Sequence, residues 1–228
     1  MDSTSNDGLH LYSYWRSSAA WRVRIGLALK GLACTIEPVH LLRDGGQQHA
    51  PDYVALNPQQ LVPLLLHGQR AVYQSLAILE YLEEAWPQAV PLLPATARER
   101  ARVRGLAQLV ACDIHPLNNL RVLQYLEREW DIPADGREAW ARHWMEQGLD
   151  AFEALVADNP ATGQFCHGDA PGLADCCLVP QVYNARRFGM DVARWPTLAR
   201  IEQACQALPA FAAAAADTQP DAPLQPAG

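Results

Sequence analysis

Short apolar runs and helical spacings alternate along the first 86 residues. The run Leu9, Leu11 and Tyr12 predicts a strand, and apolar residues then recur at helical intervals from Trp21 to Leu32. A second strand, a hairpin and another helix follow. Because a crossover connects the first two strands, they should be parallel. The pattern predicts strands at 8–13, 34–40, 61–66 and 69–73, and helices at 18–31 and 76–86.

From about residue 96 onward the pattern predicts helices only, at 98–130, 135–158, 173–188 and 197–208. Pro116 should kink the first of these, and a loop should cover 159–172. Three prolines between 87 and 94 mark a domain boundary. We therefore predict an α/β domain over residues 8–87, an all-helical domain over 96–212 and a flexible tail over 213–228, since Pro209 disfavours a continued helix.

Composition narrows the class of protein. The chain has 228 residues and a formal net charge of −7, which argues against nucleic acid or an anionic membrane as a partner. No apolar run approaches the ~18 residues of a membrane span. The first eight residues are polar and unlike a signal peptide, so we expect them to be disordered and the protein to be cytoplasmic. Six cysteines without C-x-x-C spacing predict buried free thiols and no metal site.

Candidate chemistry lies first at the start of the 18–31 helix. Ser17 and Ser18 stand where backbone N–H groups lack intrahelical partners and the helix dipole is positive, with Arg16, Arg22 and Arg24 nearby. Such a place can hold an anion, for which a thiolate is one candidate. The simpler interpretation is that one serine is only an N-cap. Further along, Pro63 predicts a bend at a strand start, and Ser75 an N-cap.

Several motifs together resemble one known family. They are S-S-x-x-W-R-V-R-I (17–25), D-G-G-Q-Q (44–48), N-P-Q-Q-L-V-P (57–63), Q-S-x-A-I-x-E-Y-L (74–82), C-D-I-H-P-L-N-N (112–119) and L-A-D-C-x-L-V-P-Q (173–181). In this order, over roughly residues 9–208, they resemble the zeta class of cytosolic glutathione transferases. The resemblance implies the glutathione-transferase fold, which joins a thioredoxin-like βαβ-ββα domain to an all-α domain.

The resemblance also implies a glutathione site. By likeness, Val62 before a cis Pro63 presents its backbone to the cysteinyl part of glutathione. Gln74 and Ser75 take the γ-glutamyl carboxylate at a helix N-terminus, and Gln48 reaches the glycyl end. His115 and Asn119, spaced i and i+4, could line the same cleft. The alternatives are that Ser75 is only a cap, Gln48 a solvated loop residue and His115 a structural histidine.

The reaction implied for the class is a glutathione-dependent cis–trans isomerisation of a maleyl dicarboxylate. Ser17 is the hydroxyl that would stabilise the thiolate, with Ser18 as the alternative. By likeness Arg16, Arg121 and Arg186 would grip the substrate, because arginine forks match carboxylates; the alternative is that Arg121 and Arg187 are solvated helix charges. The chain departs from the common S-S-C pattern of the class by carrying Ala19, so a protein thiol at this position is excluded.

Four functions remain open at the level of the sequence. The first is conversion of maleylacetoacetate to fumarylacetoacetate in aromatic (tyrosine) catabolism, and the same chemistry on maleylpyruvate is the nearest alternative. A general glutathione S-transferase is the third, and a non-catalytic binding module the last. By analogy with the family we expect a homodimer. A second departure, Gly172 where the family has Ser or Thr, should still leave Asp175 to cap its helix.

Overall fold

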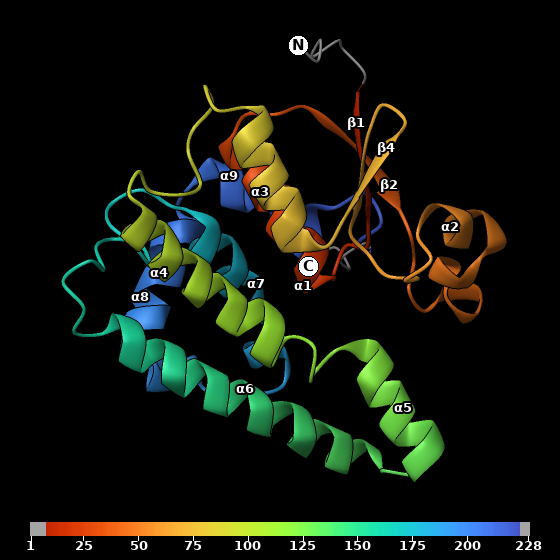
Figure 1. Ribbon diagram of the computed structural model, residues 1–228. Coiled ribbons are helices and arrows are strands. Elements are labelled where there is room, and N and C mark those ends of the chain that lie inside the picture. The colour runs from red at the N-terminus through yellow and green to blue at the C-terminus, as the bar shows by residue number, and fades with distance from the viewer. Residues whose placement is uncertain (1–7, 224–228) are drawn as a thin grey trace. The chain divides into compact units, whose positions relative to one another are not determined.

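The computed structural model describes residues 8–223 and divides into two compact units (Figure 1). The sheet unit holds the chain up to Leu92 together with the C-terminal segment from Leu208, and the helical unit holds Leu93–Ala207. The predicted disorder of the first eight residues falls almost wholly outside the described residues. Among the described helices, none is both long and apolar enough to cross a membrane.

Four strands form the sheet in the order β2-β1-β3-β4. They are β1 (Leu9–Ser13), β2 (Cys34–Pro38), β3 (Leu64–His67) and β4 (Arg70–Tyr73). β1 runs parallel to β2, as predicted, and antiparallel to β3. β3 begins three residues later than predicted and includes His67, because Pro63 has no N–H for the ladder and stands before the strand.

Helices cover both faces of this sheet. α1 (Ser18–Leu29) and α3 (Ser75–Ala85) pack on one face, where Leu11, Val23, Leu65 and Ile78 form a buried cluster. Alternate strand residues point the other way, and there Leu64 and Tyr12 pack with Tyr53 of α2 (Pro51–Leu56). α2 is not among the helices predicted from the sequence; Pro51 at its first position fits the helix start, where a missing N–H is harmless.

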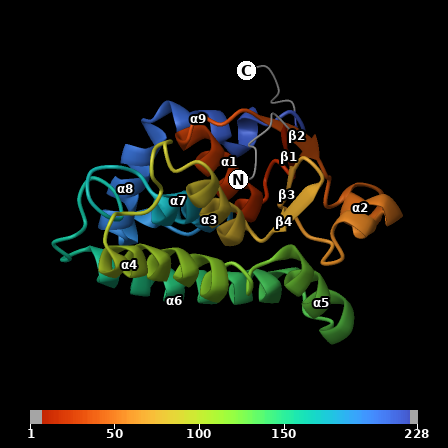
Figure 2. The ribbon, with the colours of Figure 1, turned by 45° about the horizontal axis from the view of Figure 1, so that its top comes forward.

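The C-terminal segment returns to the sheet unit. α9 (Pro209–Ala214) lies beside α1 in both views (Figures 1 and 2), and a 3₁₀ turn, η5 (Ala216–Thr218), follows it. The prediction of a flexible tail from residue 213 is corrected for 213–223, since Ala214 and Ala216 are buried. Pro209 starts a helix rather than preventing one. Residues 224–228 lie outside the described part.

The helical unit contains α4 (Ala97–Gln108), α5 (Leu120–Trp130), α6 (Ala134–Val156), α7 (Leu173–Arg187) and α8 (Pro196–Gln206). The single kinked helix predicted over 98–130 is wrong. A π-helical turn, η3 (Leu109–Ile114), follows α4, and the chain then leaves the helix at Pro116. A new helix starts where the Asn119 side chain accepts a hydrogen bond from the Arg121 N–H.

Asp175 caps α7 as predicted. Its Oδ2 accepts the Gly172 N–H at 2.8 Å, and its Oδ1 accepts the Cys166 N–H at 2.9 Å. Burial raises the pKa of this carboxyl, whereas the two N–H groups favour its charged form. The carboxylate thus joins the loop before α7 to the first turn of the helix.

Candidate functional site

The sheet register brings four chain segments to one edge. Tyr12 at the end of β1 pairs with Leu64 at the start of β3, and Leu64 pairs with Tyr73 at the end of β4. β2 is parallel to β1, and the Val39 N–H donates to Ser13 O just beyond it. The loop before α1, the segment before β3, the start of α3 and the loop after β2 therefore meet at this edge. The candidates of the sheet unit all lie on these four segments.

Ser17 is the N-cap of α1. Its Oγ accepts the Ala20 N–H at 3.2 Å, and its own N–H donates to Tyr14 O at 2.9 Å. The capping interpretation is thus confirmed, and it is compatible with an anion site, because a hydroxyl that accepts one hydrogen bond can still donate its own proton. Ser18 is the first helical residue and is buried. Arg16 is half-buried, with its guanidinium 5.3 Å from the Trp15 ring centroid.

Val62 and Pro63 are joined by a cis peptide bond, as the family likeness implied. Val62 is buried, directly before β3. The Tyr53 hydroxyl and the Asn57 side-chain amide both donate to Leu61 O, at 2.6 and 2.7 Å. These bonds hold the segment from its α2 side. Sequence reasoning did not single out Tyr53 or Asn57 as supports.

Ser75 is not an N-cap, contrary to the prediction. It is the first residue of α3, and Gln74, with a positive φ of 68°, precedes it as the cap. The Ser75 hydroxyl accepts a hydrogen bond from Arg22 Nη1 at 3.2 Å. The Gln74 amide donates to Gln59 Oε1 at 2.9 Å. The hydroxyl is therefore held from α1, while the N-terminal amides of α3 have no intrahelical acceptor.

Gln48 is buried rather than solvated. Its Nε2 lies 3.0 Å from His49 Nε2, and His49 Nδ1 lies 2.5 Å from Gln60 Oε1. In this arrangement the histidine proton belongs on Nδ1, where Gln60 accepts it. Gln48 Oε1 is buried with no hydrogen-bond partner within residues 8–223. Such an atom calls for a donor that the protein itself does not provide.

The helical unit brings three of its four predicted residues together. His115 Nε2 lies 3.3 Å from the Asn119 amide nitrogen, and Asn119 Oδ1 accepts the Arg121 N–H. The contact arises across the turn at Pro116, and not along one continuous helix as predicted. Arg121 is exposed, on the first turn of α5.

Arg186 stands apart from this group in the described structure. Its Nη1 forms an ion pair with Glu202 of α8, whose side chain is almost fully buried. The neighbouring Arg187 instead donates through Nε and Nη2 to Asn184 Oδ1, and the Asn184 amide donates to Asn118. Arg187 is thereby linked to the 115–119 turn. The i, i+3 spacing of Asn184 and Arg187 was the sequence signal for this pairing.

Arg22 and Arg24 on α1 are buried, whereas from the sequence they were expected only to add positive charge near Ser17 and Ser18. Arg22 holds Ser75, and Arg24 binds the loop before α1 and the C-terminal segment. Burial lowers the pKa of Arg24 to about 9, and the Asp221 carboxylate opposes that shift. Their sequence signal is weak, because an arginine on a helix is more often a solvated surface charge than a buried donor.

All six cysteines are free thiols, as predicted, but two are not buried. Cys112 is exposed and Cys34 is half-buried, and burial raises the pKa of Cys34 to about 12. Within residues 8–223, no group of three or more histidine, cysteine, aspartate or glutamate side chains could hold a metal ion.

Comparison with known families identifies the chain. The family model of the glutathione S-transferase N-terminal domain matches residues 16–85, and that of the C-terminal domain matches residues 134–216. The chain belongs to the glutathione S-transferase family. The predicted α/β and all-α halves are those of this family, so the predicted fold class is confirmed.

Three relatives narrow the comparison. A "probable maleylacetoacetate isomerase" of Vibrio cholerae is 48% identical, over 94% of this chain and 98% of its own. A bacterial zeta-class maleylpyruvate isomerase in its holo form is 46% identical, covers 94% and 100% of the two chains and superposes with a TM-score of 0.90. Maleylacetoacetate isomerase from Methylobacterium extorquens AM1, with bound malonate and glutathione, is 44% identical with the same coverage and TM-score. The resemblance to the zeta class is therefore confirmed.

Proposed function

We propose that this glutathione transferase is a glutathione-dependent cis–trans isomerase that converts maleylacetoacetate to fumarylacetoacetate, and we place it in aromatic catabolism. The observation that carries the proposal is the start of α1, where a capping serine with a proton to donate stands at the same sheet edge as Val62 and Ser75. The names of the relatives, similar over almost their full length, supply the substrate class.

The residues at this edge fit glutathione. Gln48 Oε1 is a buried acceptor that lacks a donor in the described structure, the α3 N-terminus suits a carboxylate, and Val62 offers backbone groups beside a strand. We assign glutathione binding to Gln48, Val62, Pro63, Gln74 and Ser75, with His115 and Asn119 as contributions of the helical unit. When bound, glutathione supplies a thiolate that adds reversibly to the maleyl double bond and so lets that bond rotate.

The chain's own contribution to this chemistry is to keep the sulfur anionic. With glutathione bound, the Ser17 hydroxyl would donate to the sulfur, and the N–H groups of Ser18 and Ala19 at the positive end of α1 would favour negative charge there. Together these effects lower the pKa of a thiol at this place. Because residue 19 is alanine, this position supplies no protein thiol for the reaction.

The substrate carries two carboxylates and gains enolate charge during the reaction, so cations must face it. We propose Arg16 from the sheet unit and Arg121 from the helical unit for this role. Arg186 remains a candidate from the family likeness, but its ion pair with Glu202 gives it a structural partner. Arg187 is linked through Asn184 and Asn118 to the 115–119 turn, and we rank it ahead of Arg186.

Two alternatives share this site. Maleylpyruvate isomerisation uses the same chemistry on a shorter substrate, and one similar structure bears that name. General conjugation would leave glutathione attached to an electrophile. A site with several arginines suits an apolar electrophile less well than it suits a dicarboxylate. We also propose a homodimer, which the family likeness supports. We place the protein in the cytoplasm, because the six free thiols fit a reducing compartment.

One assay tests the proposal. Purified protein is mixed with glutathione and either maleylacetoacetate or maleylpyruvate, and the fumaryl product is followed optically. We expect turnover of maleylacetoacetate that requires glutathione without consuming it. Turnover of maleylpyruvate alone would select the alternative substrate, consumption of glutathione would select conjugation, and binding to immobilised glutathione without any turnover would leave only a binding module.

A further inference from the structure

A buried arginine organises the loop before α1. The Arg24 guanidinium donates to Ser13 Oγ at 2.9 Å, to Tyr14 O at 3.3 Å and to Trp15 O at 2.9 Å. Tyr14 O also accepts the Ser17 N–H. One carbonyl thus receives both the arginine and the backbone of the capping serine. The position of Ser17 depends on how firmly Arg24 and this loop are held.

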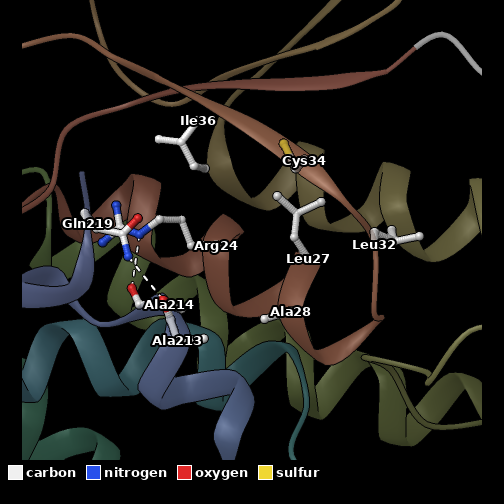
Figure 3. A pocket seen from close by; sticks show the side chains of 9 residues that line it. All are labelled: Arg24, Leu27, Ala28, Leu32, Cys34, Ile36, Ala213, Ala214 and Gln219. Carbon is white, nitrogen blue, oxygen red and sulfur yellow. Dashed lines mark hydrogen bonds between the residues drawn. The ribbon is translucent and has the colours of Figure 1, made fainter. Parts of the chain in front are cut away.

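The C-terminal segment 208–223, called the strap from here on, holds the same arginine and the same loop. Ala214 O in α9 accepts Arg24 Nε at 3.1 Å, a bond drawn in Figure 3. Beyond η5, Asp221 Oδ2 accepts the Trp15 N–H at 2.9 Å. The strap is therefore connected to the loop in two ways. One connection runs through Arg24, and the other is the direct hydrogen bond to Trp15, two positions before Ser17.

Packing fills the seam between the strap and the rest of the sheet unit only in part. Between the strap and α1 and β2 lies an open pocket of about 170 Å³, lined by apolar side chains such as Leu27 and Ile36 and by Gln219 (Figure 3). Gln219 donates to Ala213 O and Ala215 O, which closes the strap on itself. The buried side chains of Phe211 and Ala214 hold α9, and the hydrogen bonds at Arg24 and Asp221 attach the strap to the loop before α1.

We propose that Asp221 and Arg24 are positioning residues for Ser17, so that the strap sets the acidity of the thiol bound at the start of α1. The inference rests on the proposed function and goes beyond it, because it assigns a role in the chemistry to a segment some 200 residues away in sequence. Asp221 acts through the Trp15 amide, and Arg24 acts through the Tyr14 and Trp15 carbonyls.

The test compares Asp221→Ala with Asp217→Ala. Asp217 is exposed on the same strap and carries the same charge, so its loss controls for charge and for general damage to the segment. The apparent pKa of enzyme-bound glutathione is read from thiolate absorbance against pH. For Asp221→Ala we expect that pKa to rise by about one unit and kcat at neutral pH to fall about tenfold, with KM and the unfolding temperature little changed.

Rescue separates positioning from charge. Asp221→Asn keeps an oxygen that can accept the Trp15 N–H and should restore both the thiol pKa and kcat. Arg24→Lys, which cannot make the fork of bonds, should resemble Asp221→Ala if it folds. If Asp221→Ala matches Asp217→Ala in thiol pKa and kcat, the inference is wrong.

Amide hydrogen exchange keeps this test independent of the proposed function. The Trp15 amide should exchange at least tenfold faster in Asp221→Ala than in Asp217→Ala, and this requires no substrate. If the natural protein binds no glutathione, the proposed function fails, and the exchange rates alone then decide whether the strap holds the loop. Unchanged exchange would overturn the strap's role altogether.

Discussion

At the scale of the residue, Ser17 combines two roles that the sequence presented as alternatives. Its Oγ accepts the Ala20 N–H as an N-cap, and its proton remains available to a sulfur atom. A single substitution therefore affects both the stability of α1 and the proposed chemistry, and the two effects have different sizes.

Ser17→Ala should lower kcat about 100-fold, the usual cost of one lost donor to a reacting anion. It should also lower the free energy of unfolding by about 1 kcal/mol through the lost cap. Steady-state kinetics and urea unfolding measure the two separately. Ser17→Thr keeps both functions and should stay active, and Ser18→Ala is the matched control. An active Ser17→Ala beside an inactive Ser18→Ala would identify Ser18 as the donor.

The arginine pair on α7 gives a second prediction at this scale. Arg187→Ala should raise KM for the dicarboxylate about tenfold with little loss of stability, because the residue is linked to the 115–119 turn. Arg186→Ala should instead lower stability, because Glu202 would remain buried without its ion-pair partner. Kinetics and unfolding of both variants decide the order, and the reverse pattern would restore Arg186 as the substrate contact.

The cysteines differ in how readily they should react. Exposed Cys112 should be alkylated first, whereas half-buried Cys34, with its pKa raised to about 12, stays a neutral thiol near pH 7. Its reaction rate should climb about tenfold per pH unit as pH rises toward that value. Mass spectrometry after timed iodoacetamide treatment locates each adduct, and Cys112→Ser should remove the fast one. Rapid labelling of Cys34 at neutral pH would contradict the expectation.

At the scale of the element, α1 is fastened at both ends. Its C-terminal Lys30 is buried and pairs with Glu83 of α3 at 2.9 Å, and the same carboxylate accepts the Leu92 N–H. A buried ion pair contributes little net stability, but the loss of one partner leaves the other charge without compensation. α1 thus keeps its alignment with α3, and through Arg22 the alignment of Ser75.

Glu83→Ala should therefore lower the free energy of unfolding by about 3–5 kcal/mol. Glu84→Ala, one position away and exposed, should change it by less than about 0.5 kcal/mol. Urea unfolding of both variants gives the comparison. A Glu83→Ala protein as stable as the control would mean that water reaches Lys30.

The elements that the sequence predicted well have strong local signals. Short apolar runs located the strands within three residues, and the motifs around Ser17 and Val62 located two segments that the sheet register brings to one edge. Other features depend on distant residues. A proline is common both at the start of a helix and just after the end of one, so Pro209 by itself does not predict α9. The burial of Phe211 and Ala214 is what favours a helix there. Likewise, Ser75 lies inside α3 because Gln74, with its positive φ, is the cap, and Arg22 of α1 donates to the serine hydroxyl.

At the scale of the whole molecule, most of the proposed glutathione contacts belong to the sheet unit. A ligand that binds only the folded protein stabilises it by about 2.7 kcal/mol at a hundred times its Kd. Saturating glutathione should therefore raise the urea midpoint, and Ser75→Ala should reduce the rise. S-methylglutathione, which lacks a thiol proton, controls for the sulfur. No shift with glutathione at any concentration would contradict a site built mainly from these residues.

The return of the strap to β1 and α1 has a consequence for biosynthesis. The bond between Trp15 and Asp221 joins the loop after β1 to a residue made some 200 positions later, so the ribosome must add the strap before the sheet unit can close. The segment that carries Ser17 is therefore made well before the strap that contacts its loop. A polypeptide stalled just before residue 208 would hold every proposed glutathione-binding residue and still lack the hydrogen bonds from Ala214 and Asp221.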